Sequence, residues 1–161
     1  MNERIEKAFN EQIKNELESA YIYLAMSAYF ESQGWKGMAK WMRTQVKEEQ
    51  AHAMKFYDHI FERNGRVHFT ALAQPKTEWA SPVEAWKEAY KHEQFITGTI
   101  KNLAKLAEGE GDYSARPLLD WFLNEQIEEE DQTRTVVDAL EKIGTSMPGL
   151  FMLDAQLGKR E

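Results

Sequence analysis

Carboxylate and imidazole side chains recur in four separate parts of the 161-residue sequence. Glu49 and His52 are three positions apart, a spacing that places both side chains on one face of an α-helix. The other three parts each contribute a carboxylate of their own: Glu16, Glu93 and Glu129. Four carboxylates and one imidazole are a ligand set that suits a pair of iron or manganese ions. The residue types therefore predict a two-metal centre.

The spacing of these residues repeats between the two halves of the chain. Glu16 and Glu49 are 33 positions apart, and so are Glu93 and Gln126. Each of them lies 14 to 18 positions from a glycine-containing break near residues 34 or 111. If these breaks are hairpin turns, the two halves are pseudo-twofold copies with their polar groups near mid-height. Such an arrangement would let the side chains converge on one buried point.

Sparse glycine and proline residues leave four long segments with apolar residues at alternating steps of three and four, which is helical periodicity. They cover roughly 3–32, 38–63, 83–108 and 115–143. The breaks between the first two and between the last two are short, so each joins antiparallel neighbours. Helices of about 27 residues span roughly 40 Å, and the connection at about 65–81 can reach roughly 55 Å. With a short fifth helix at about 148–158, the chain is predicted to be one all-α domain, 1–161, a four-helix bundle of two hairpins joined by a long crossover.

Polar residues interrupt the apolar stripe of every helix. Continuing each rhythm through its gap gives one set: Glu16, Gln45, Glu49, His52, Glu93, Gln126 and Glu129. Buried carboxylates cost several kcal/mol each unless they are paired, hydrogen-bonded or bound to a metal. The alternatives are solvated helix faces or a buried hydrogen-bond network. A solvated face is the usual explanation for one glutamate, but a shared metal site better explains the matched heights on four helices.

The composition excludes several classes of protein. The chain has no cysteine, which rules out disulfides, thiolate zinc sites and iron–sulfur clusters. A formal charge of −7 argues against a nucleic-acid partner, because phosphate binding needs clustered lysine and arginine. No stretch approaches the length of an apolar membrane span, and the polar residues 1–14 do not resemble a signal peptide. We therefore expect a cytoplasmic protein without a membrane partner.

Over essentially its whole length, the sequence resembles the non-haem ferritins of bacteria and archaea. The resemblance rests on four segments: Asn15–Glu18 with Tyr21–Tyr23, Glu48–His52, Tyr90–Gln94, and Trp121 with Asn124–Glu130. Any one of them alone would be a weak signal, but together at these separations they are specific. The resemblance implies a first iron bound by Glu16, Glu49 and His52. It also implies a second iron bound by the bridging Glu49 with Glu93 and Glu129, with Gln126 beside it and Tyr23 near the site.

Bacterial members of this family can carry a third iron next to the pair. By resemblance this site maps onto four acidic residues: Glu48, Glu125, Glu128 and the shared Glu129. Glu125, Glu128 and Glu129 share one helical face. A run such as Glu128–Asp131 is equally typical of a solvated helix surface, so both interpretations stay open.

Two departures separate the chain from close relatives of the family. A bacterioferritin repeats the Glu-x-x-His motif in its fourth helix, where this chain has Gln126 and Glu129, and its haem-ligating methionine is replaced here by Gln50. Haem is therefore not expected. A rubrerythrin-like peroxidase needs a cysteine-bound iron, which this chain cannot form. The unequal ligand sets suggest one firmly held iron and one more exchangeable iron.

The resemblance implies a ferroxidase that oxidises iron(II) with dioxygen or peroxide and stores iron(III) mineral. It also implies a hollow homo-oligomer of 24 subunits with the fifth helix near the fourfold contacts. Two other classes of function remain open. One is a di-iron oxidoreductase or peroxidase without storage, and the other is a metal-free helical interaction protein.

Overall fold

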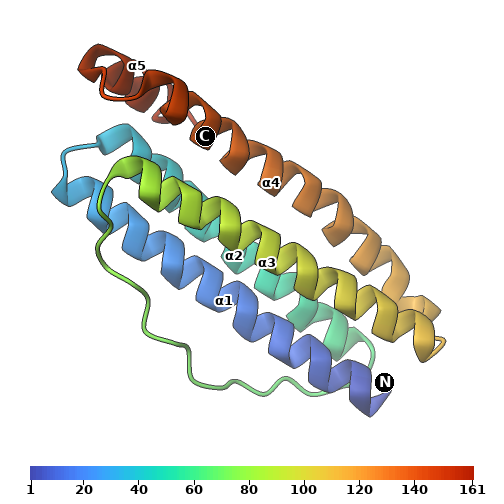
Figure 1. Cartoon of the computed structure of the whole chain (residues 1–161). Helices are drawn as coiled ribbons and strands as arrows, with labels where there is room; N and C mark the ends of the chain where they lie inside the picture. Colours follow the sequence, from blue (N-terminus) through green and yellow to red (C-terminus); the bar gives the residue numbers. More distant parts are fainter.

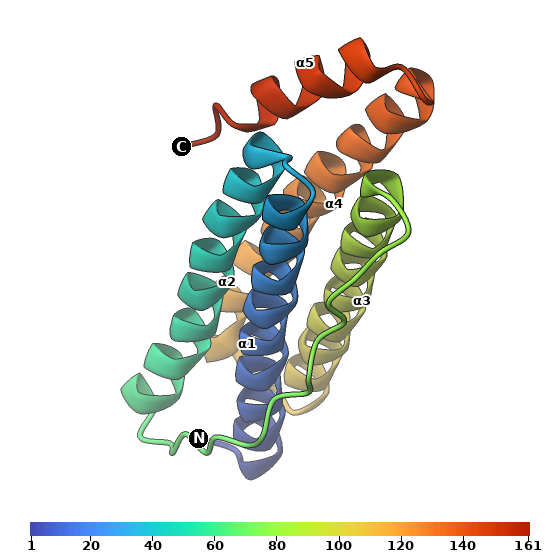
Figure 2. The same ribbon diagram turned by 90° about the vertical axis from the view of Figure 1, so that its left-hand side faces the viewer.

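Five α-helices make up most of the chain in the computed structural model, which describes all residues from Met1 to Glu161. The four long helices are α1 (Glu3–Ser32), α2 (Lys36–Glu62), α3 (Pro82–Gly109) and α4 (Arg116–Ile143). A short 3-10 helix, η1 (Tyr113–Ala115), leads into α4, and α5 (Met147–Leu157) ends the fold. The long helices lie side by side as a bundle, and α5 runs across one end of it (Figures 1 and 2). The predicted fold class is confirmed.

The extended segment between α2 and α3 gives the bundle its topology. It runs along the outside of α1 and α3 from one end of the bundle to the other, so α2 and α3 are parallel (Figures 1 and 2). Side chains of α1 hold this segment through its backbone. The His68 N–H donates to Asn10 Oδ1 at 2.6 Å, and the Ala73 N–H donates to Glu18 Oε1 at 3.0 Å. The crossover therefore packs as an ordered strap over the bundle.

Three of the helices begin with a side-chain cap from the residue before them: Asn2 for α1, Ser81 for α3 and Ser146 for α5. Helix α2 has no such cap, because its preceding residue is Trp35. Instead, Asp154 Oδ1 in α5 accepts a hydrogen bond from the Met38 N–H at 2.8 Å. The Asp154 side chain thus accepts from one of the backbone N–H groups that have no partner within the first turn of α2.

Helix α2 begins at Lys36, two residues before the predicted start at 38. The chain reverses at Gly34, whose positive φ of 81° suits glycine. Gly37 lies inside the helix and has a different role, because α5 packs against it. A Cβ atom at this position would lie 1.8 Å from the Asp154 carbonyl oxygen. The prediction was wrong here because it read both glycines as parts of one break.

A polar layer separates two apolar clusters in the core. The cluster nearer α5 includes Phe30, Met42 and Trp86, and the other includes Phe9 and Phe56. The buried polar side chains near mid-height are Gln12, Glu16, Ser19, Gln45, Glu49, His52, Glu93, Gln126, Glu129 and Thr133. The apolar clusters therefore enclose the polar layer from both ends of the bundle.

No helix has the length and apolar character needed to cross a membrane.

Candidate metal centre

The five metal-binding candidates meet near the middle of the four long helices. Helix α1 contributes Glu16, α2 contributes Glu49 and His52, α3 contributes Glu93 and α4 contributes Glu129; each is at most 4% exposed. They form two groups of three, in which one donor atom of each residue lies within 4.8 Å of the others. The first group is Glu16, Glu49 and His52, and the second is Glu49, Glu93 and Glu129. Glu49 belongs to both groups, as a bridging carboxylate would.

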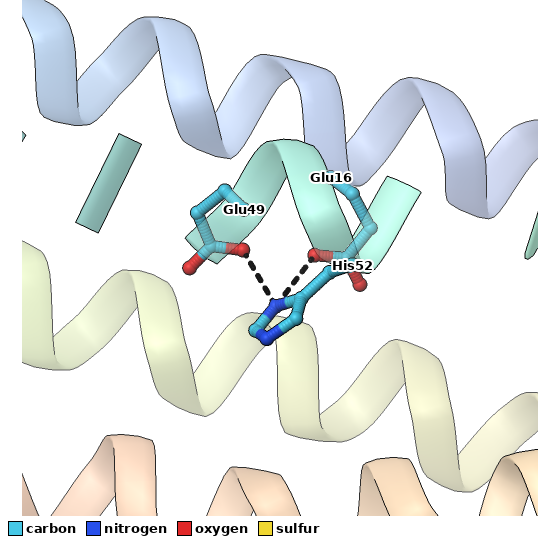
Figure 3. Close-up of side chains that lie close together, drawn as sticks. All are labelled: Glu16, Glu49 and His52. Atoms are coloured by element: carbon cyan, nitrogen blue, oxygen red, sulfur yellow. Dashed lines mark hydrogen bonds and ion pairs between the residues drawn. The ribbon is translucent and has the colours of Figure 1, made fainter. Parts of the chain in front are cut away.

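The first group surrounds the imidazole of His52. Its Nδ1 atom lies 3.1 Å from Glu49 Oε2 and 3.8 Å from Glu16 Oε2, so both carboxylates point at one ring nitrogen (Figure 3). Gln12 Nε2 donates to the other oxygen of Glu16 at 2.9 Å. Glu16 Oε2 is buried without any hydrogen-bond partner. Buried polar atoms are rarely left unpaired, so this oxygen is free for a cation bound between the carboxylates and the ring.

Amide and phenol groups hold the carboxylates of the second group. Gln45 Nε2 donates to Glu49 Oε1 and to Glu129 Oε2, both at 2.9 Å. Gln126 Nε2 donates to Glu93 Oε2 at 3.1 Å, and the Tyr23 hydroxyl donates to Glu93 Oε1. All of these contacts are donations to carboxylate oxygens, so they fix the orientation of the acids.

Burial makes the charged form of these acids costly. It raises the pKa of Glu49 to about 7, with the charge of Glu16 adding to the shift. Burial and the charge of Glu49 raise the pKa of Glu93 to about 8, and burial and the charge of Glu93 raise that of Glu129 to about 10. No lysine or arginine pairs with these acids, and His52 is the ion-pair partner of Glu16 and Glu49. In the metal-free centre, bound protons therefore neutralise the buried acids, and bound cations could neutralise them instead.

The same surroundings favour the protonated, charged form of the His52 imidazole. Burial by itself lowers its pKa, but the nearby carboxylates of Glu16 and Glu49, the latter within hydrogen-bond distance, outweigh burial and raise it to about 11. A metal ion bound at this ring would take the place of the proton, because a metal ligand must be the neutral imidazole. The donor set fits paired cations of the iron or manganese type.

The acidic residues predicted for a third iron do not all meet. Glu125 does approach the centre, because it forms a third close group with His52 and Glu129, and its Oε1 lies 3.8 Å from His52 Nε2. Glu48 pairs with Arg160 at 3.0 Å, outside these groups. Glu128 is exposed and accepts a hydrogen bond from Gln132. The structure thus brings Glu125 to the centre and leaves Glu48 and Glu128 apart from it.

Comparison with known proteins agrees with this geometry. A profile of the ferritin-like domain matches residues 6–143. The chain belongs to the ferritin family. It is 35% identical over 160 residues to a bacterial non-heme ferritin of Bacteroides fragilis strain 638R, covering 99% of both chains. It is 36% identical over 160 residues to a bacterial non-heme ferritin of Staphylococcus saprophyticus, covering 99% of this chain and 96% of the relative.

Solved structures show the same relationship in three dimensions. The open-pore ferritin of the hyperthermophilic archaeon Archaeoglobus fulgidus superposes with a TM-score of 0.99 at 41% identity. The match covers 100% of this ferritin chain and 99% of the archaeal one.

Sequence reasoning missed several residues that support the centre. Gln45 was recognised as a polar interruption, but its bonds to two of the candidate ligands were not predicted. Gln12 lies one helical turn before Glu16, a spacing that could have indicated their contact. Thr97 accepts from Gln126 Nε2 at 3.2 Å and donates to Glu130. Nothing in the sequence pattern indicated Arg160, whose contacts depend on where α5 docks.

The remaining histidines, His59, His68 and His92, lie outside the three close groups. His92 Nε2 lies 2.7 Å from Ser19 Oγ, and its ring packs edge-on against Tyr23. His59 packs against Phe9, and His68 is exposed on the crossover.

Proposed function

We propose that this ferritin oxidises iron(II) at the centre of Glu16, Glu49, His52, Glu93 and Glu129. The iron(III) product is stored as mineral in a hollow homo-oligomer of 24 subunits. The observation that carries the proposal is the sharing of Glu49 between two buried three-ligand groups without a lysine or arginine partner. Membership of the ferritin family supports it. The name non-heme ferritin, borne by the bacterial relatives, favours storage without haem.

Iron is the substrate of the proposed reaction. Two iron(II) ions each give one electron to dioxygen, which takes up two protons and leaves as hydrogen peroxide; peroxide is the alternative oxidant. Carboxylate ligands favour the product, because their Coulomb attraction is stronger for iron(III) than for iron(II). Glu49 would keep the two ions adjacent, and the protons on Glu49, Glu93 and Glu129 would leave as iron(II) enters.

The two halves of the centre differ in their donors, and this suggests different tasks. The first group contains an imidazole and a carboxylate oxygen without another partner, whereas the second contains carboxylates that also accept hydrogen bonds. We propose that the first iron is held firmly and the second exchanges. Glu125, which lies close to Glu129 and His52, would hold a third iron toward which the second iron moves, and Glu48 and Glu128 would have to change rotamer to join it.

Aerobic loading of the purified protein with iron(II) tests the proposal. Absorbance in the near ultraviolet follows oxidation, and sizing of the product with iron analysis follows storage. We expect rapid oxidation and large assemblies that retain many more irons than the two per chain that the centre itself can hold. Oxidation that stops near two irons per chain in a small oligomer would instead indicate a di-iron oxidoreductase or peroxidase without storage.

Replacing the shared ligand gives the matching variant test. Glu49→Ala removes a donor from both groups, so we expect iron(II) oxidation to slow at least about tenfold, the lower end for disturbing a metal site. Gln50→Ala changes the adjacent exposed residue of the same helix and should oxidise iron at the rate of the unmodified protein. Equal rates in Glu49→Ala and Gln50→Ala would contradict an oxidation centre at these residues.

A further inference from the structure

Arg160, in the segment after α5, reaches back over α2. Its guanidinium carbon lies 4.0 Å from the centroid of the Trp41 ring. One guanidinium nitrogen donates to the Trp41 carbonyl oxygen at 3.2 Å, and the other donates to Gln45 Oε1 at 2.9 Å and lies 3.0 Å from Glu48 Oε2. The side chain is only 15% exposed. A flexible side chain with this many partners is held in one place.

The contact with Gln45 dictates how that amide is turned. A guanidinium group has donors only, so it must meet the oxygen of the amide and never its nitrogen. Gln45 is completely buried, and its nitrogen therefore faces the opposite side, where it donates to Glu49 and Glu129. Arg160 thus reaches two carboxylates of the centre through a single intervening side chain.

Without Arg160, the amide of Gln45 would lose the donor that selects its orientation. When Glu49 and Glu129 give up their protons to bind metal, a turned amide would present its oxygen to their carboxylate oxygens, which repel it. Each of these acids would then lose a hydrogen bond that aims it. Hydrogen bonds to charged groups are stronger than those between neutral groups, so their loss would leave both acids poorly oriented for metal binding.

The docking of α5 brings Arg160 to this position. Asp154 caps the start of α2, and the absence of a side chain at Gly37 lets the two helices touch. Figure 2 shows α5 crossing the end of the bundle, with the chain end returning over α2. The segment after α5 is therefore tied to the same helix that carries Gln45 and Glu49.

We propose that Arg160 is a positioning residue of the metal centre and acts through Gln45 on Glu49 and Glu129. The inference rests on the proposed function, because it assumes that these acids bind metal. Changing a group that orients a metal ligand typically lowers metal affinity or activity 10–100-fold. We expect Arg160→Ala to weaken binding of the cation held by Glu49, Glu93 and Glu129 by about tenfold or more.

Anaerobic titration of the assembled protein with Co(II) tests this without any oxidation step. Calorimetry gives the affinities, and the visible absorption of Co(II) reports the geometry of its ligands. Arg160→Ala should lose affinity and show altered absorption. Lys159→Ala, which removes the same charge from the neighbouring exposed position, should match the unmodified protein in both. Thermal unfolding of each variant shows whether the bundle itself is intact.

A double variant shows whether Arg160 affects metal binding through Gln45 or by another route. If Arg160 acts only through this amide, Gln45→Ala and Gln45→Ala with Arg160→Ala should bind Co(II) equally, because coupled residues are not additive. Additive losses, or unmodified binding by Arg160→Ala, would overturn the inference and leave the proposed function standing. If the unmodified protein bound no Co(II) and oxidised no iron, the proposed function would fall and this inference with it.

Discussion

Among the residues of the centre, Glu49 links the two predicted ligand groups. It is shared by both ligand groups, approaches His52 with one oxygen and accepts from Gln45 with the other. Glu16 and Glu93 each belong to one close group only, and Glu129 shares its second group with Glu125 and His52. Because Glu49 couples the two groups, changes to it should disturb both cations, whereas changes to Glu16 or Glu93 should disturb chiefly one.

The protons held by the metal-free centre make the stability of the protein depend on pH. Glu49, Glu93 and Glu129 have pKa values raised from 4.5 to about 7, about 8 and about 10. The folded protein therefore keeps protons that the unfolded chain loses. The contribution of these acids to the free energy of unfolding is fully present below pH 4.5 and is lost as pH rises through 7 to 10. His52 acts in the same direction, because its pKa is raised from 6.5 to about 11.

We therefore expect the metal-free protein to unfold at progressively lower temperature between pH 5 and pH 9. The slope is on the order of 1 kcal/mol per pH unit for each proton retained. Glu129→Gln should flatten this dependence, because it removes the acid with the highest of the three raised pKa values. Glu62→Gln, at an exposed position, is the control. Differential scanning calorimetry at several pH values measures the effect, and identical slopes in both variants would contradict it.

At the scale of helices, the contact between α5 and the start of α2 has several consequences. It caps α2 through Asp154, buries Leu153 and Leu157 against the bundle, and brings Arg160 toward Gln45. Close approach of the two backbones depends on Gly37. A short helix outside the bundle thus affects the environment of the centre.

Gly37→Ala tests this contact. The added methyl group would meet the Asp154 carbonyl oxygen at 1.8 Å, a backbone atom that cannot turn away. We expect a loss of about 1–3 kcal/mol in unfolding free energy, as for other overpacked sites. Gly98→Ala is the matched control, because a Cβ atom there has no neighbour within 4 Å. Alanine favours a helix over glycine by about 1 kcal/mol, so this control should unfold at the same or a higher temperature.

At the scale of the whole molecule, the apolar layers stabilise the fold and the polar layer between them holds the candidate metal ligands. Two apolar clusters supply burial at the ends of the bundle, and the polar layer between them holds acids that weaken the metal-free fold. Helix α5 also presents large apolar side chains to solvent in the single chain. Met147 is 57% exposed, Phe151 63% and Met152 74%. Exposed apolar surface of this kind marks contacts between subunits, which suits the proposed shell.

Met152→Glu tests assembly apart from oxidation. A charge on this exposed face should make burial between subunits unfavourable and shift the protein to smaller oligomers, while the centre inside each chain stays unchanged. We expect iron(II) oxidation to continue but the number of irons retained per particle to fall steeply, since storage needs a cavity that the assembled subunits surround. Light scattering after size-exclusion chromatography and iron analysis measure both. Gln156→Glu, the same charge change at an exposed polar position of α5, is the control.

Periodicity and the spacing of chemical groups were enough to predict the fold. The three-and-four rhythm and the break lengths predicted four helices, two hairpins and the long crossover, because helical faces and chain reach follow from local geometry. The same rhythm predicted that Glu16, Glu49, His52, Glu93 and Glu129 would converge, and the structure brings them together. That they bind iron stays a prediction. The interruption of an apolar stripe is a strong signal because buried charge is costly wherever it occurs.

Only the tertiary structure decided which groups support the centre. Spacing cannot reveal that Gln45 donates to Glu129 on another helix, or that Glu48 faces Arg160 instead of Glu128. These contacts join residues far apart in the chain, and their partners depend on helix rotation and on the docking of α5. The different roles of Gly34 and Gly37 have the same cause, because one glycine serves a local turn and the other a close approach by a distant helix. Local sequence determines the elements, whereas side chains that meet across elements are selected by packing.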